Sequence, residues 1–208
     1  MLAAAHDLLF PLGQSLGRAF ASDGERGAPR VRVGDSYAEL PERLFDCWRL
    51  VRDLGALDAP PTVESLQTLA DARGLDDRSA DLQTLISAGL VSAVPVDYDA
   101  VHAFAGSVRL QSAVNGYGPA ADLPGRFEVG VLGQTIIDVG AAMYGALMWS
   151  DVSETLLGAV EPGGLAETAD DMAVREMGLA TQLLEGVLGL PELLAWSAAY
   201  LDATGAAR

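Results

Sequence analysis

The stretch that decides the fold is Arg30-Val-Arg-Val-Gly-Asp-Ser-Tyr-Ala-Glu-Leu40, followed at once by Pro41. Polar and apolar residues alternate on both sides of Gly-Asp, a pair typical of a tight turn, so the pattern predicts a short β-hairpin. Pro41 suits the first turn of a helix. Apolar residues, among them Trp48, then recur at helical spacing up to Gly55. We therefore expect a helix directly after the hairpin, with Trp48 in the core.

Two further helices and a strand are predicted downstream. Thr62 is a candidate N-cap for the second helix, and Asp76 or Asp77 for a third helix that runs to about residue 88. Residues 90–94 form a short apolar run that is typical of a strand. The expected order is therefore a hairpin, three helices and a strand.

The same order begins again further along the chain. Arg126-Phe-Glu-Val-Gly130 is similar to Arg30-Val-Arg-Val-Gly34, and strand-like and helix-like patterns follow it. This repetition predicts a degenerate second module. The expected fold class is α+β, predominantly helical, with tandem winged-helix-like modules and short β-hairpins. The expected domains are an N-terminal helix and linker (1–29), a first module (30–96), a linker helix and loop (97–125), and a second module with a C-terminal helix (126–208).

Apolar helices are expected at both ends of the chain. Residues 1–20 are typical of an amphipathic helix interrupted at Pro11, and residues 191–201 of a last helix. Their apolar surface exceeds what two small modules need to cover themselves, and such a surplus commonly marks an interface. We therefore expect a homodimer.

The charge of the chain disfavours several classes of partner. Thirteen basic residues, all arginine, stand against 29 acidic ones, for a net charge of −16. Such a charge repels the phosphate backbone of DNA and anionic membrane surfaces. The longest uncharged apolar run, 139–149, is too short to span a bilayer. The N-terminal residues lack the basic stretch of a standard signal peptide. We therefore expect a cytoplasmic protein that binds a peptide or protein, with nucleic acid less favoured and no membrane.

The sequence offers no constellation typical of catalysis. His6 and His102 are isolated, lysine is absent, and no phosphate-binding loop or zinc motif occurs. The pair Asp76-Asp77 stands where a helix is expected to begin, and the helix dipole favours acidic residues there. Cys47, the single cysteine, has the helical spacing of a small buried residue. We therefore expect no catalytic residue, no cofactor and no metal site, and a non-enzymatic function.

Residues 31–94 resemble the small winged-helix modules related to the PqqD family, which recognise leader peptides in peptide-modification systems. The resemblance covers about a third of the chain, with a weaker similarity over 127–187. The family module is single and short, whereas this chain is longer. The residues that carry the resemblance are the hairpin, the helix with Trp48, Thr62-Val-Glu-Ser-Leu66, and Leu82-Gln-Thr-Leu-Ile86 with Gly89-Leu-Val91.

The resemblance implies a protein that binds an extended peptide by strand addition, in a groove between the hairpin and the third helix. The implied peptide contacts are Arg30, Arg32 and Tyr37 on the hairpin and Leu82, Gln83 and Ile86 on the helix. The alternative interpretation of Leu82 and Ile86 is that both simply face the core.

The rival function is that of a winged-helix transcription regulator, whose third helix enters the major groove of DNA. The candidate DNA contacts on that helix are Arg78, Ser79, Gln83 and Thr84. Acidic residues on and beside the same helix make it a poor match for phosphate contacts. Peptide or protein binding is therefore the preferred expectation.

Overall fold

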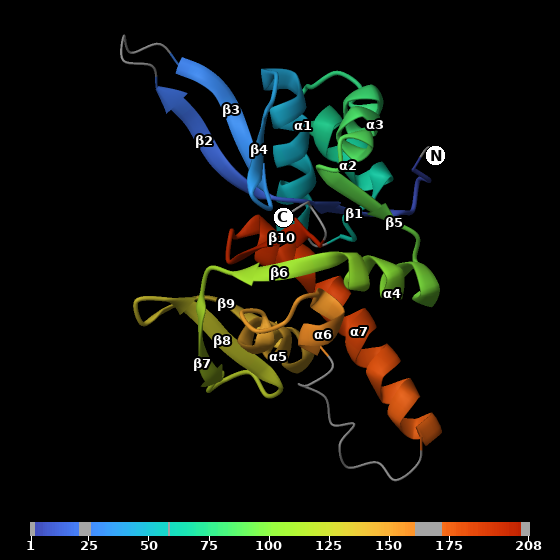
Figure 1. Ribbon diagram of the computed structural model, residues 1–208, viewed down its shortest axis with the longest axis vertical. Helices are drawn as coiled ribbons and strands as arrows, with labels where there is room; N and C mark the ends of the chain where they lie inside the picture. Colours follow the sequence, from blue (N-terminus) through green and yellow to red (C-terminus); the bar gives the residue numbers. More distant parts are fainter. Residues whose placement is uncertain (1–2, 21–25, 58, 161–171, 205–208) are drawn as a thin grey trace. The chain divides into compact units, whose positions relative to one another are not determined.

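A computed structural model describes residues 3–20, 26–57, 59–160 and 172–204 (Figure 1). The chain divides into two units: unit 1 comprises Met1–Val96 with Leu201–Arg208, and unit 2 comprises Asp97–Tyr200. Helices and small antiparallel sheets make up both units, so the expected α+β class is confirmed. Within the described ranges, no helix is long and apolar enough to cross a membrane.

Unit 1 contains the expected hairpin, three helices and strand, together with two strands that the sequence did not indicate. β2, β3 and β4 form an antiparallel sheet with β3 in the middle, and β1 pairs with β5. The elements are β1 (Leu8–Pro11), β2 (Gln14–Phe20), β3 (Arg26–Val33), β4 (Ser36–Glu39), α1 (Glu42–Asp53), the 3-10 turn η1 (Leu54–Ala56), α2 (Val63–Ala72), α3 (Ser79–Ser87) and β5 (Val91–Val94).

The N-terminal helix expected over residues 1–20 is wrong for the described residues, because β1 and β2 occupy that stretch. All four residues of β1 are buried, which suits a strand covered on both faces better than a one-sided helix. Gly13 separates the two strands with a φ of 88°. A Cβ atom at Gly13 would lie 2.3 Å from the carbonyl oxygen of Arg32, so only glycine fits this close approach. The linker expected up to residue 29 is likewise wrong from Arg26 onward, where β3 begins.

The core of unit 1 surrounds α1. Trp48 is 2% exposed, and its ring stacks on Phe45 with the two centroids 6.0 Å apart. The indole Nε1 donates to the backbone oxygens of Leu12 and Leu90, both at 3.1 Å. The predicted burial of Trp48 is therefore confirmed, and its ring joins α1 to segments that precede and follow the helices.

Cys47 lies on the same buried side of α1, as the sequence predicted, and is a free thiol. Burial raises its pKa to about 12, and the Asp81 carboxylate adds to this effect. Because the thiolate is the reactive form, we expect native protein at pH 8 to resist a thiol reagent that labels the guanidinium-unfolded chain rapidly.

Alkaline pH should also destabilise unit 1, because the folded state keeps a proton that the unfolded thiol loses near its ordinary pKa of about 8.5. The contribution of Cys47 to the free energy of unfolding is thus complete below that value and is lost as the pH rises toward 12. Stoichiometric labelling of Cys47 in native protein at pH 8 would contradict this account.

Unit 2 begins with a helix that has no counterpart in unit 1 and then repeats the order of elements found in unit 1. A first strand precedes a three-stranded antiparallel sheet, three helices follow, and the last strand pairs with the first. The elements are α4 (Tyr98–Ser107), β6 (Val108–Ser112), β7 (Asn115–Pro119), β8 (Arg126–Val131), β9 (Gln134–Gly140), α5 (Ala141–Trp149), α6 (Leu156–Val160), α7 (Met172–Ala195) and β10 (Ala199–Ala203), whose last residues count with unit 1. Tandem duplication as the origin of this order stays a prediction, which superposition of the two units tests.

Two expectations for unit 2 are wrong. The loop expected up to residue 125 contains β6 and β7, so β8 and β9 belong to a three-stranded sheet rather than to a hairpin alone. The separate last helix expected over 191–201 is the end of α7 followed by β10, and Pro191 lies inside α7. The two glycines that were matched in the sequence also occupy different positions in the structure: Gly34 lies in a turn, whereas Gly130 lies within β8.

Candidate functional site

β4 forms an edge of the unit 1 sheet. β3 pairs with β2 on one side and with β4 on the other. Arg30 and Arg32 therefore lie on the central strand, whereas Tyr37 lies on the edge strand. A strand added to this sheet can pair with β4 or with β2, and not with β3.

The hairpin turn determines which backbone groups of β4 face outward. The two-residue turn at Gly34 is closed by the pair Val33 and Ser36, and hydrogen-bonded and non-hydrogen-bonded pairs alternate from there. Tyr37 and Glu39 thus direct their N–H and C=O groups away from β3. Among the described residues, no backbone–backbone hydrogen bond from outside β3 reaches β4. These four backbone groups are the ones that strand addition uses.

Polar side chains cover the face of this sheet that points away from the core. Arg30 donates from Nε to Oε1 of Glu39 at 2.9 Å, and its guanidinium lies 4.7 Å from the centroid of the Tyr37 ring. Tyr37 is 57% exposed. Arg32 is directly opposite Tyr37 across the strands and shares this face, because the intervening Val31 is buried. We call Arg30, Arg32, Tyr37 and Glu39 the outer sheet face.

The candidate peptide contacts on α3 are less accessible than those on the hairpin. Leu82 is 3% exposed and belongs to the core, as the alternative interpretation has it, and Ile86 is partly buried against that core. Gln83 donates from Nε2 to the hydroxyl of Ser87 on its own helix, at 3.4 Å. The structure thus brings Arg30 and Tyr37 together on the hairpin and leaves Leu82 out of reach of a ligand.

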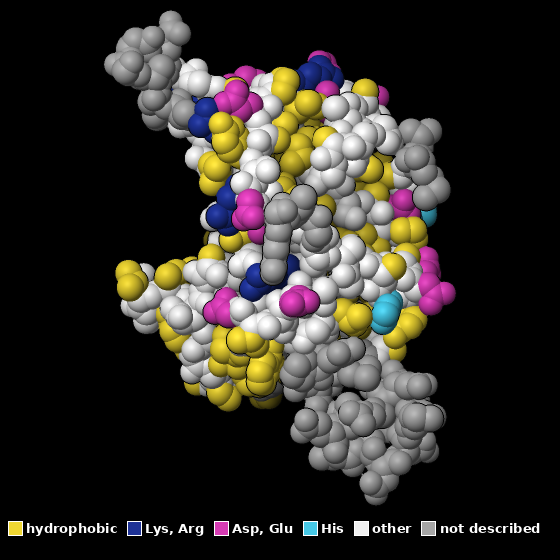
Figure 2. Space-filling model, in the orientation of Figure 1, with side chains coloured by type: hydrophobic (Ala, Val, Ile, Leu, Met, Phe, Trp, Pro, Cys, Tyr) yellow, Lys and Arg dark blue, Asp and Glu magenta, His cyan; other side chains and the backbone are white. Residues whose placement is uncertain are grey.

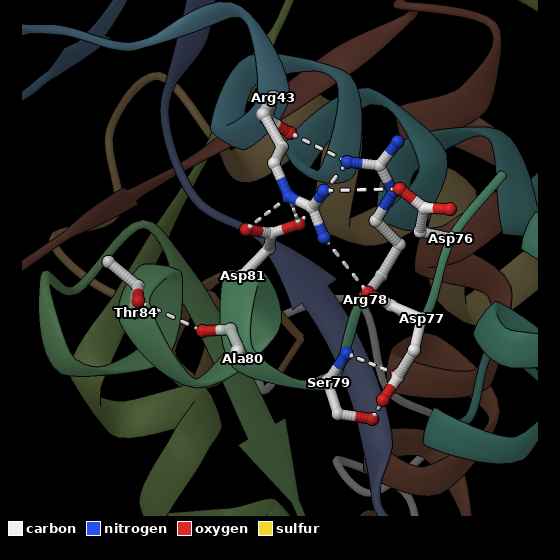
Figure 3. Close-up of polar contacts among 8 residues, drawn as sticks. All are labelled: Arg43, Asp76, Asp77, Arg78, Ser79, Ala80, Asp81 and Thr84. Atoms are coloured by element: carbon white, nitrogen blue, oxygen red, sulfur yellow. Dashed lines mark hydrogen bonds and ion pairs between the residues drawn. The ribbon is translucent and has the colours of Figure 1, made fainter.

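The candidate DNA contacts are engaged within unit 1 (Figure 3). Arg78 is 6% exposed, and its Nη1 donates to Oδ2 of Asp81 at 3.2 Å. The hydroxyl of Ser79 donates to Asp77 at 2.7 Å, and that of Thr84 donates to the backbone oxygen of Ala80 at 2.9 Å. To contact a phosphate group, Arg78 would therefore have to break its ion pair with Asp81 and move out of its buried position.

Asp81 is the centre of a polar network between α1 and α3, which Figure 3 shows in full. Besides Arg78, it accepts from Nε of Arg43, at 2.8 Å and 3.1 Å to its two carboxylate oxygens. Arg43 also contacts Asp76 at 3.4 Å and the backbone oxygen of Asp77 at 3.1 Å. No local sequence pattern predicts this network, because Arg43 and Asp81 are far apart in the chain and come into contact only in the folded unit.

The N-cap of α3 is Arg78, which makes no side-chain cap bond, so the capping role that the sequence assigned to Asp76 or Asp77 is wrong. Asp77 lies one residue before the N-cap. Its Oδ1 accepts from both the hydroxyl and the backbone N–H of Ser79, and these bonds hold the pKa of Asp77 below its usual value. Across the described part of the chain, no group of three or more His, Cys, Asp or Glu residues is placed to hold a metal ion. Comparisons with protein-family models, curated proteins and solved structures found no match.

Proposed function

We propose that this chain is a non-catalytic peptide-binding protein that takes up an extended polypeptide as an added strand on β4. The main support is the open edge of β4, where Tyr37 and Glu39 offer outward backbone groups beside an exposed aromatic ring. In strand addition, backbone hydrogen bonds supply affinity and alternate side chains supply specificity. Here Arg30 and Tyr37 are the specificity groups. Each unit contains, in this proposal, a winged-helix-like module built around one three-stranded sheet and the three helices that follow it.

Unit 2 supports such binding less well. Its edge strand β9 already has one backbone oxygen, that of Asp138, bonded by the guanidinium of Arg126. Arg126 also lies 3.9 Å from the carboxylate of Glu192. We therefore assign one peptide site per chain, on unit 1.

A backbone substitution at Glu39 tests this proposal. Glu39→Pro removes an outward N–H without removing a bond to β3, whereas Glu39→Ala removes only the side chain. With peptides selected from a phage-displayed random library as probes, we expect Glu39→Pro to weaken binding by about tenfold, the effect of one lost hydrogen bond. Glu39→Ala controls for the lost contact with Arg30.

Two results would contradict the proposal. One is equal binding of the selected peptides by Glu39→Pro and Glu39→Ala, and the other is failure to select any peptide. Duplex DNA from beside the gene serves as a parallel probe of the DNA-binding alternative. Salt-sensitive retention of that DNA, weakened by Thr84→Ala, would favour a regulator, whereas the pairing of Arg78 with Asp81 argues against one.

A further inference from the structure

The turn between β8 and β9 contains an unusual residue. Leu132 and Gly133 form a two-residue turn with φ values of 53° and 79°. Turns of this kind favour Gly, Asn or Asp at both positions, and the unit 1 turn has Gly34 at the first of them. Leu132 is 97% exposed, so its side chain contributes nothing to the core of unit 2. A bulky residue held at positive φ without an internal role points to a role outside the fold.

Further apolar side chains surround this turn. Val131, Ile136 and Tyr117 are each exposed over more than a third of their surface. Ile136 is the extra residue of a bulge in β9, and bulges commonly re-aim side chains. The hydroxyl of Tyr117 accepts from the backbone N–H of Gly133 at 2.8 Å and so fixes the turn. We call these four residues the apolar tip, and Figure 2 shows hydrophobic side chains at the end of this hairpin.

The charge around the apolar tip is acidic. Glu128 and Asp138 lie directly opposite each other across β8 and β9, an arrangement that is unfavourable for like charges. Unit 2 as a whole carries 3 arginines against 14 acidic residues, for a net charge of −11. Unit 1 carries 10 arginines against 15 acidic residues, for a net charge of −5. A surface that combines apolar groups with arginines would complement the tip.

We propose that the apolar tip docks on the outer sheet face of unit 1 in a second copy of the chain. That face offers the exposed Tyr37 ring for apolar contact, and Leu16 on the neighbouring β2 is also exposed. The face carries Arg30 and Arg32 against one carboxylate, that of Glu39, which pairs with Arg30, so its net charge complements the acidic pair that flanks the tip. The proposal goes beyond peptide binding, because it uses the face of the sheet rather than the edge of β4.

The decisive variant is Leu132→Gly, because glycine adopts positive φ without strain and the fold does not need the leucine side chain. Light scattering at micromolar concentration, without any peptide, should give at least twice the chain mass of 21.7 kDa for wild-type protein. Leu132→Gly should give the single-chain mass with a Tm no lower than that of the wild type. Leu123→Ala, at another exposed leucine of unit 2, should keep the wild-type mass.

A charge exchange locates the surface that receives the tip. Glu128→Arg and Arg32→Glu should each lower the fraction of associated chains, and the double variant should restore it. Tyr37→Ala should give the single-chain mass. A wild-type protein of 21.7 kDa at every concentration, or unchanged association of Leu132→Gly, would overturn the proposal. Association that survives Tyr37→Ala and Arg32→Glu would overturn it as well, because the tip would then dock elsewhere.

Discussion

Trp48→Ala should lower the free energy of unfolding by about 3–5 kcal/mol, the range for deletion of a large buried aromatic side chain. The ring is almost fully buried and stacks on Phe45, so its removal leaves a cavity at the centre of unit 1. It also removes the indole N–H shared by the carbonyls of Leu12 and Leu90. Urea denaturation followed by circular dichroism measures the loss.

Two matched variants separate the contributions to this effect. Trp48→Phe keeps an aromatic ring and removes the indole N–H, so it should cost less, about 1–3 kcal/mol. Trp196→Ala removes a tryptophan that is 57% exposed and should change stability by about 0.5 kcal/mol or less. If Trp48→Ala behaved like Trp196→Ala, the proposed role of the ring in the core would be wrong.

Asp81→Ala should also be strongly destabilising, by about 3–5 kcal/mol, because it leaves a buried arginine without its carboxylate. The side chain of Arg78 is 8% exposed and that of Asp81 12%, so solvent screens their interaction only weakly. Arg43 loses its shortest contact in the same variant. Urea denaturation of the variant measures the cost.

The controls for Asp81→Ala come from the same network. Asp76 contacts Arg43 from an exposed position, so Asp76→Ala should change stability by about 0.5 kcal/mol or less. The double variant Arg78→Leu with Asp81→Leu removes both charges and should be more stable than Asp81→Ala. If the double variant were the less stable of the two, the buried charge would not be the cause.

The hairpin and the first three helices could be predicted from the sequence because their signals are local. Alternation on both sides of Gly34, the cap at Thr62 and the helical spacing around Trp48 each lie within a few residues. β1 and β2 could not be predicted in this way. Their pairing with β5 and β3 is decided by distant residues, and a short buried strand has the same apolar run as a buried helix.

The same contrast between local and long-range signals applies to the residues of the candidate site. Tyr37 and Arg30 were expected as peptide contacts because of the family resemblance, and the register of the tight hairpin brings them together. The burial of Leu82 and Arg78 depends on how α3 packs, which no local pattern reports. Leu132 was missed because its positive φ and its exposure belong to the folded turn, and no local pattern in the sequence predicts either of them.

The pairing of β1 with β5 has a consequence for synthesis on the ribosome. Leu8 is the partner of Val94, so β1 cannot pair until β5 has been synthesised. During this interval the apolar run of β1 has no strand partner, and such unpaired segments are prone to aggregation. Long-range pairing of this kind also slows folding, since the loop must close before the contact is gained. The pairing of β1 with β5 is therefore completed only after β5 has been synthesised, whereas the local hairpin of β3 and β4 can pair earlier.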